Sequence, residues 1–300
     1  MNENTDETLQ DIFMQHGCGA LILYTLSFLD VVTLLRKQVV SKHFKELCSK
    51  TITAKCGEDG PPPLTNETLR TAIREFCPIM YDPSFNKDDM EEIACKYGFP
   101  IDSWNVSQVT EMSQLFFWFR HDHSSVENWD PSDIYEMNSV PYFNLYIGSW
   151  NTSNVTNMNF MFENAFHFNQ DIGKWDVSNV ESMNGMFHSA LAFNQDIGRW
   201  NVSNVKGMDK MFYSAMEFNQ DIGQWDVSNV VYMDEMFYSA VAFNQDIGRW
   251  DVSNVKCMYN MFRDAKAFQF DLSSWDVSHV LEKYGMLPEG FPEKFHPRNL

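Results

Sequence analysis

"FNQDIGRWDVSNV", at residues 243–255, recurs along the chain at a constant interval. Nearly the same letters begin at Phe168, Phe193 and Phe218, each 25 residues after the one before. The tryptophans keep the same interval and stand at Trp150, Trp175, Trp200, Trp225, Trp250 and Trp275. A fixed period of this length is the signature of a repeat array in which each unit buries its apolar face against its neighbours.

Each unit carries two apolar patterns when its Trp is counted as position 1. Positions 9, 12, 13, 16 and 19, which run from Met183 to Phe193 in one unit, have helical spacing and predict a short helix. The alternating residues Ile197, Trp200 and Val202 predict a brief strand. We therefore expect an α/β repeat solenoid with one short strand and one short helix per 25-residue coil, preceded by a small all-α N-terminal module.

The polar residues of the repeat are interpreted as structural rather than as a ligand site. Position 5 is Asn in every internal unit, and it changes to Gln108 in the first unit and to His279 in the last. A residue that bonds between successive coils would change where a coil has only one neighbour, because buried polar groups must find partners. The predicted ladder consists of Asn154, Asn179, Asn204, Asn229 and Asn254.

Three chemical alternatives stay open beside this structural interpretation. The Trp column could bind sugars, although alternation with Ile and Val favours wedge packing in the core. His121 and His123, with Glu127 and Asp130, offer metal ligands in a polar insertion. A column of aspartates could bind Ca²⁺, or each could accept N–H bonds within its own turn; it consists of Asp171, Asp196, Asp221, Asp246 and Asp271.

The sequence contains no recognisable catalytic constellation. It has no GxSxG, P-loop or HExxH motif and no Cys–His pair in a recognisable context. We expect a protein that is not an enzyme, needs no cofactor and holds no metal.

One column of the repeat varies from unit to unit and is predicted to face solvent. Position 14 lies on the outer face of the predicted helix and includes Tyr and Arg, which are enriched at interface hot spots. We expect it to bind a protein partner, with an ordinary solvated face as the alternative. The column consists of Glu163, His188, Tyr213, Tyr238 and Arg263.

The composition bounds the partner and the compartment. A net charge of −19 argues against general affinity for nucleic acid or anionic membranes, because phosphate binding requires basic surface. The polar, acidic start predicts no signal peptide, and the longest apolar stretch is too short for a membrane span. Six scattered cysteines fit a reducing compartment. We expect a cytoplasmic or nuclear protein.

Composition also divides the chain. We expect a helical module at 1–55, a linker at 56–64 that includes "CGEDGPPPL", and a helical cap at 65–103. The solenoid is predicted at 104–287, beginning with a degenerate copy at Trp104 and carrying an insertion near 117–139. Residues 288–300, where the pattern ends among prolines, form the C-terminal cap or tail.

The segments "WDVSNVESMNGMFHSALAFNQDIGRW" and "WNVSQVTEMSQLF" resemble the 25-residue repeat of BspA-like surface proteins over about 104–287. The resemblance implies a leucine-rich-repeat-like solenoid and a binding or adhesion role without catalysis.

The stretch "LSFLDVVTLLRKQVVSKHFKEL" at 26–47 resembles an F-box. In that family the helices dock onto a Skp1-type adaptor of a cullin ubiquitin ligase, and a C-terminal repeat domain holds the substrate. The resemblance implies a substrate receptor, with a BspA-like surface or adhesion protein as the alternative. The implied adaptor-binding residues are Leu26, Leu29, Leu34, Leu35, Val40, Phe44 and Leu47.

Overall fold

The computed structural model describes residues 61–81, 93, 96–98, 101–116 and 143–300. The helices with described bounds are the α-helix α5 (Asn66–Tyr81) and two short 3₁₀ helices, η1 (Ile101–Ser103) and η4 (Glu293–Phe295), and residues 93, 96 and 97 are also helical. The chain divides into two compact units. One contains residues 1–62 and 75–104, and the other contains residues 63–74 and 105–300, including the regular repeats.

Helix α5 lies at the start of the segment predicted to be a helical cap, and it is amphipathic. Leu69, Ala72, Ile73 and Phe76 are all buried, as their spacing at three and four residues predicts. The helix begins after Thr65, whose Oγ1 accepts a hydrogen bond from the backbone N–H of Thr68.

In the unit that contains residues 75–104, aromatic rings surround Trp104. The rings of Phe76 and Tyr97 lie 5.5 and 5.7 Å from it, and its indole Nε1 donates to the carbonyl of Gly98 at 3.0 Å. Gly98 has a φ of 98°, a conformation that favours glycine.

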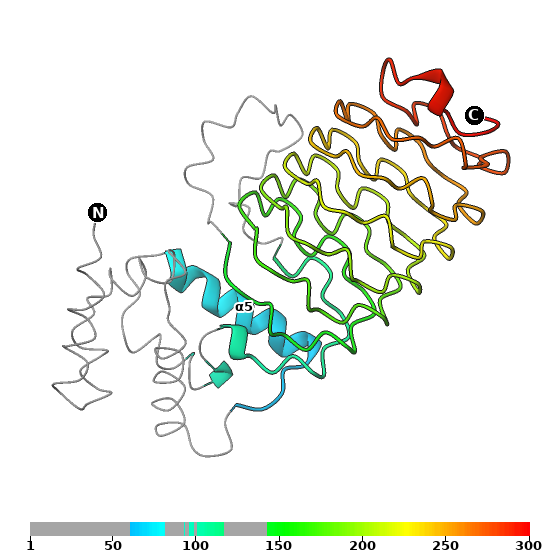
Figure 1. Ribbon diagram of the computed structural model, residues 1–300. Helices are drawn as coiled ribbons and strands as arrows, with labels where there is room; N and C mark the ends of the chain where they lie inside the picture. The colour runs from blue at the N-terminus through cyan, green and yellow to red at the C-terminus, as the bar shows by residue number, and fades with distance from the viewer. Residues whose placement is uncertain (1–60, 82–92, 94–95, 99–100, 117–142) are drawn as a thin grey trace, which may run out of the picture. The chain divides into compact units, whose positions relative to one another are not determined.

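The other unit is a stack of successive 25-residue coils, drawn from green to red in Figure 1. Position 8 of each coil forms an isolated parallel bridge with position 8 of the next. Position 7 of each coil after the first donates its N–H to the position 7 carbonyl before it, as Val231 does to Lys206 at 2.8 Å. The bridged residues are Glu111, Asn157, Ser182, Gly207, Tyr232, Cys257 and Glu282.

The predicted short helix is wrong in the described coils, where tight turns replace it. The backbone N–H groups at positions 12, 16 and 19 donate three residues back, as in Ala190 to Phe187 at 3.0 Å. Positions 11 and 15 adopt positive φ, for example 58° at Gly185 and 56° at Ser189. A residue with positive φ cannot continue a right-handed helix, so the helix would end at each of these positions. The apolar residues that are spaced as in a helix therefore lie on successive turns.

The predicted strand at residues 197–202 is also absent, and backbone pairing occurs instead at position 8. Trp200 donates its N–H to the carbonyl of Ile197 at 3.1 Å, which closes a turn where a strand was expected. The assignment to a leucine-rich-repeat-like class stays a prediction, since it depends on the sequence pattern.

Two columns of phenylalanine form the centre of each coil. Within a coil the rings of positions 13 and 19 stack closely, as in Phe187 and Phe193 at 3.9 Å. Along the stack, Phe187 and Phe212 are 5.6 Å apart and Phe193 and Phe218 are 6.0 Å apart. All these rings are fully buried, so the rings of each coil are covered by those of its neighbours.

The glycine at position 24 is required by a close approach between coils. A Cβ at Gly173, Gly198, Gly223 or Gly248 would overlap the carbonyl oxygen of the Asp at position 22 of the next coil. In the coil that starts at Trp250 this position is Ser273, and there the C-terminal segment lies beside it: Leu272 donates its N–H to the carbonyl of Phe295, and Nε of Arg298 donates to the carbonyl of Ser273, both at 3.0 Å.

The two ends of the stack differ in how the coil edge is covered. At the first coil, Asn66 of α5 accepts hydrogen bonds from the N–H groups of Thr110 and Glu111 at 2.9 and 3.2 Å. Beyond the last coil, Arg298 pairs with Asp276, and the ring of Phe291 stacks on Phe268 at 5.7 Å.

Candidate functional site

The position 14 residues of five coils include four, from Glu163 to Tyr238, whose side chains contact one another in sequence. Nδ1 of His188 lies 3.3 Å from Oε1 of Glu163, within ion-pair distance if the imidazole is protonated. The rings of His188 and Tyr213 lie 4.7 Å apart at an angle of 47°, and those of Tyr213 and Tyr238 lie 4.7 Å apart and almost parallel. We call this row the outer column.

Most of the outer column is half-buried, whereas the sequence predicted an exposed row. Glu163, His188, Tyr213 and Tyr238 each have intermediate exposure, and only Arg263 is exposed. Because each ring covers its neighbour, the column presents ring edges and polar tips to solvent rather than whole side chains. Burial raises the pKa of Tyr213, and the nearby charges of Tyr238, Glu235 and Asp264 add to the effect.

Beside the outer column, position 10 holds a row of polar side chains that link successive coils. Oδ1 of Asn184 accepts the N–H of Asp209 at 3.0 Å, and Oδ1 of Asp209 accepts the N–H of Asp234 at 3.0 Å. Burial raises the pKa of Asp209 to about 6, although the hydrogen bond from Asp234 opposes the shift. This row was not predicted, and its signal was the amide or acid at position 10 in four consecutive coils.

The predicted ladder residues bond between coils but lie at the surface. Nδ2 of Asn204 donates to the carbonyl of Ser178 at 2.6 Å, and Asn229 does the same to Ser203 at 2.8 Å. Asn154, Asn179 and Asn254 make the equivalent bond. All five side chains are exposed, which corrects the expectation that they are buried.

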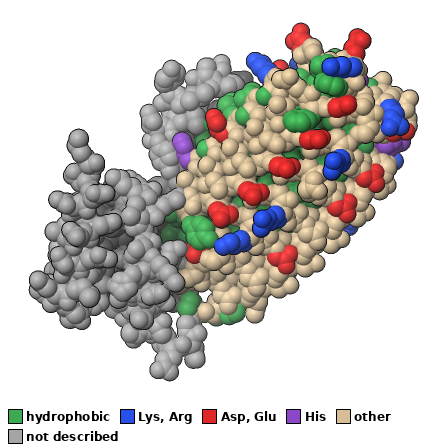
Figure 2. Space-filling model, in the orientation of Figure 1, with side chains coloured by type: hydrophobic (Ala, Val, Ile, Leu, Met, Phe, Trp, Pro, Cys, Tyr) green, Lys and Arg blue, Asp and Glu red, His purple; other side chains and the backbone are tan. Residues whose placement is uncertain are grey.

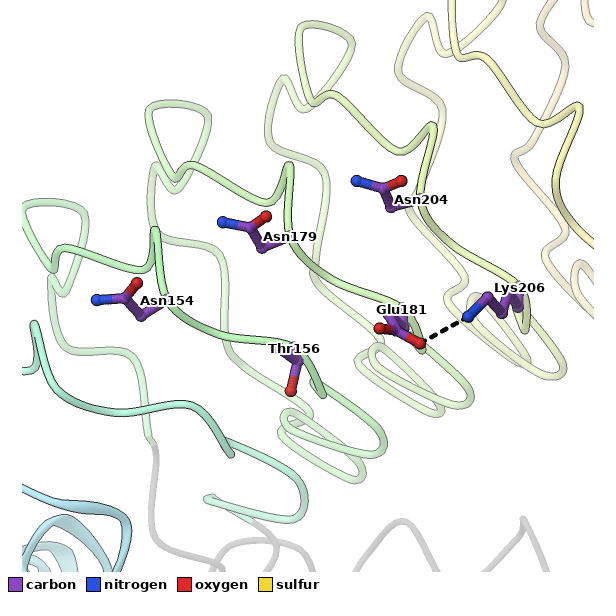
Figure 3. A pocket seen from close by; sticks show the side chains of 6 residues that line it. All are labelled: Asn154, Thr156, Asn179, Glu181, Asn204 and Lys206. Atoms are coloured by element: carbon purple, nitrogen blue, oxygen red, sulfur yellow. Dashed lines mark hydrogen bonds and ion pairs between the residues drawn. The ribbon is translucent and has the colours of Figure 1, made fainter.

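A shallow polar groove runs along positions 5 and 7 of three coils, as Figure 3 shows. Three ladder residues form one side, and Thr156, Glu181 and Lys206 form the other. Nζ of Lys206 lies 2.7 Å from Oε2 of Glu181. The groove offers amide and carboxylate oxygens, which suit hydrogen bonding to a polypeptide. The sequence identified the three asparagines as ladder residues, but the periodic spacing held no sign of a groove and did not single out Thr156 or Glu181.

The predicted metal candidates are only partly within the described residues. Each aspartate of the proposed Ca²⁺ column accepts a backbone N–H two residues ahead, as Asp196 does from Gly198 at 3.0 Å, so the own-turn alternative is what the structure contains. The parts of the chain that the structure describes contain no group of three or more His, Cys, Asp or Glu arranged to hold a metal. His121, His123, Glu127 and Asp130 lie outside the described residues.

The adaptor-binding residues predicted at 26–47 also lie outside the described residues. Figure 2 shows acidic side chains in rows across one face of the repeats, with Lys and Arg between them. Across the described ranges, the helices are all too short or too polar to cross a membrane.

Comparison with known proteins matches the repeats to one family. A family profile described as "Mycoplasma protein of unknown function, DUF285" matches residues 88–143, 118–216 and 193–293. Together these three tandem matches span residues 88–293, which is more than half of the 300-residue chain. No curated protein and no solved structure matches the chain. The matches confirm the BspA-like repeat and do not include residues 26–47.

Proposed function

We propose that this chain, which belongs to the family described as Mycoplasma protein of unknown function, DUF285, is a non-enzymatic repeat protein that binds another protein. The observation that carries the proposal is the outer column. The rings of Tyr213 and Tyr238 stack on each other with centroids 4.7 Å apart, which holds them in place. The residue type at position 14 varies from coil to coil, whereas the core residues repeat. Preordered aromatic side chains bind at low entropic cost, which favours a protein-contacting surface.

We further propose that the stack is a leucine-rich-repeat-like solenoid. The parallel bridges at position 8 and the hydrogen bonds between successive coils support this class. In residues 143–292 turns stand where a leucine-rich-repeat-like coil could carry a helix, so the proposed solenoid is one whose coils are made of turns.

The direct test is partner capture with Tyr213→Ala and Tyr238→Ala combined in the full chain. We expect a folded protein that loses partner binding, because the two rings lie at the surface of an otherwise unchanged coil. Met216→Ala, an exposed residue in the same coil as Tyr213, is the matched control. Binding by the double variant at wild-type strength would show that the outer column is only a solvated face.

The finer role proposed from the F-box resemblance is that of a substrate receptor, with 26–47 binding a Skp1-type adaptor and the repeats binding the target. The apolar pattern of that segment supports it. The test is co-purification of the adaptor and cullin with the full chain and with a Leu34→Asp, Leu35→Asp variant. Recovery with the wild type alone supports the receptor role.

The alternative is a BspA-like surface or adhesion protein, and the family match supports this kind of role. Recovery of neither adaptor nor cullin with folded wild-type chain would favour it. Glycan on the sequon at Asn201, whose side chain is exposed, would support export.

A further inference from the structure

Inside the stack, the backbone at positions 7–11 of each coil is covered by the next coil. In the coil that starts at Trp250, Met258 donates its N–H to the carbonyl of Glu282 at 2.7 Å, and Asn260 donates to Tyr284 at 2.9 Å. The carbonyl of Lys256 accepts the N–H of Leu281 at 2.8 Å. Two donors and one acceptor per coil are therefore satisfied by the following backbone.

In the last coil the same three groups have no following coil. Among the described residues, no group pairs with the carbonyl of Leu281 or with the N–H groups of Lys283 and Gly285. The C-terminal segment covers a different part of this coil, because Arg298 pairs beside Asp276. We call residues 281–285 the open edge. An unpaired row of backbone donors and acceptors is a template for an additional strand.

The side chains at the open edge are unusually exposed for their type. Leu281 and Tyr284 are 76% and 77% exposed, the largest values among the exposed large apolar side chains of the described residues. The ring of Tyr284 stacks on that of Tyr259 at 6.4 Å, and Tyr259 is itself exposed. Leu281, Tyr284 and Tyr259 therefore place apolar and aromatic side chains beside the unpaired backbone.

The charge around the open edge selects among possible occupants. Glu282 is exposed within the edge and forms the parallel bridge with Cys257 of the preceding coil. The pKa of Asp234, at position 10 two coils inward, is raised chiefly by burial, and the charges of Glu235 and Glu282 add to the effect. Of the two nearby lysines, Lys283 turns its Nζ to the carbonyls of Val277 and Asn299, and Lys256 is exposed. A second copy of this chain would bring another Glu282 and a net charge of −19 to the same edge, which is unfavourable.

We propose that the open edge, residues 281–285, binds an extended segment of a protein partner that adds as a strand and carries a basic residue opposite Glu282. Such a segment repeats the pairing found between internal coils, donating to Leu281 and accepting from Lys283 and Gly285. Apolar side chains of the segment pack on Leu281 and Tyr284, and its Arg or Lys pairs with Glu282 and stacks against the tyrosines. The proposal rests on the protein-binding function but uses a surface separate from the outer column.

The test uses the full chain and a displayed library of random linear peptides. The enriched peptides should alternate apolar residues with Arg or Lys. Binding should protect the amide hydrogens of Lys283 and Gly285 from exchange with solvent. Leu281→Ala combined with Tyr284→Ala should weaken binding about tenfold or more, because these side chains carry the apolar contact. Val241→Ala with Met216→Ala, two exposed residues away from the open edge, is the matched control.

Glu282→Lys supplies the charge test and should shift the enriched peptides from basic to acidic. Peptides that bind the Leu281→Ala, Tyr284→Ala variant as they bind the wild type would overturn the proposal, as would a library that yields no binder. Self-association that the same variant abolishes would also overturn it and assign the edge to a second copy. Loss of peptide binding in the Tyr213→Ala, Tyr238→Ala variant alone would reject the open edge and leave the proposed function standing.

Discussion

The first and last coils of the stack meet the same physical problem with different solutions. Each has backbone groups that a neighbouring coil would satisfy. At the first coil, Asn66 accepts the N–H groups of Thr110 and Glu111, and Nη2 of Arg70 donates to the carbonyl of Ser113 at 2.8 Å. At the last coil, the described residues leave the carbonyl of Leu281 and the N–H groups of Lys283 and Gly285 unpaired.

The difference shows that a repeat stack is stabilised coil by coil, while its ends are specified separately. The position 19 Phe column is covered at the C-terminal end, where Phe291 continues the stack on Phe268. The backbone at the open edge is not covered, although it lies in the same coil. The last coil can therefore have a covered core and an uncovered backbone edge at the same time, and the uncovered edge is available for binding.

The largest effect is expected from removing a ring inside the stack. Phe243→Ala should lower the free energy of unfolding by about 3–5 kcal/mol, since the ring is fully buried between Phe218 and Phe268 and its loss leaves a cavity. Phe291→Ala at the C-terminal end should cost about half as much, because that ring has a Phe neighbour on one side only. Urea denaturation measures both, and equal losses would contradict the distinction between interior and end.

The next effect tests the close approach of coils at position 24. Gly223→Ala should destabilise by about 2–4 kcal/mol, because a Cβ there overlaps the carbonyl oxygen of Asp246 and forces the backbone apart. Ser273→Ala at the equivalent position of the coil that starts at Trp250 is the control and should change stability by less than about 1 kcal/mol. Thermal denaturation compares them, and a neutral Gly223→Ala would mean that the coils can separate without cost.

The covered edge of the first coil can be opened by substitution. Asn66→Ala should cost about 1–2 kcal/mol, because two N–H groups lose the oxygen that accepts them. Hydrogen exchange at Thr110 and Glu111 should rise in the variant. Glu67→Ala, an exposed residue in the same helical turn, should leave both amides protected. Unchanged exchange in Asn66→Ala would show that this side chain does not cap the stack.

The smallest expected effect depends on pH. The pKa of Asp209 is raised from 3.8 to about 6, chiefly by burial, so the folded state disfavours the carboxylate. The cost is absent below about pH 4 and complete above about pH 6. Asp209→Asn should therefore stabilise the protein by about 1 kcal/mol at pH 7, after allowance for solvent screening, and by much less at pH 4. The pKa of neighbouring Asp234 is raised too, and Lys210 lowers both.

The control for this substitution is Asp226→Asn, which places an amide where Asn201 stands in the preceding coil. Its Tm should stay close to that of the wild type at both pH values. A gain from Asp209→Asn of equal size at pH 4 and pH 7 would refute the role of the buried charge.

Much of the core could be predicted from the repeat, and its local conformation could not. Every Phe and Met at positions 9, 12, 13 and 19 of the coils between 150 and 274 is buried, because a residue at a repeated position meets its own equivalents in the coils beside it. The helix was mispredicted, since a spacing of three or four residues fits both a helix and successive turns. Residues such as Lys210 and Glu235 have positive φ although neither is a Gly or Asn, so the residue type does not indicate this conformation.

For the candidate site, the sequence identified which positions vary but not how far they are exposed. Tyr213 and Tyr238 were correctly placed in one column, yet stacking on each other leaves them half-buried. The ladder asparagines bond to the preceding coil as expected from their pattern, but from the surface. The binding role of these residues stays a prediction.

The period of 25 residues was enough to set the register of the stack, because identical positions must stack on one another when each coil buries the next. It was also enough to identify the glycines and aspartates of the turns. The open edge could be recognised only in the tertiary structure. Whether Leu281, Lys283 and Gly285 have partners depends on where residues 288–300 pass after the last coil, and a pattern that has ended cannot predict that path.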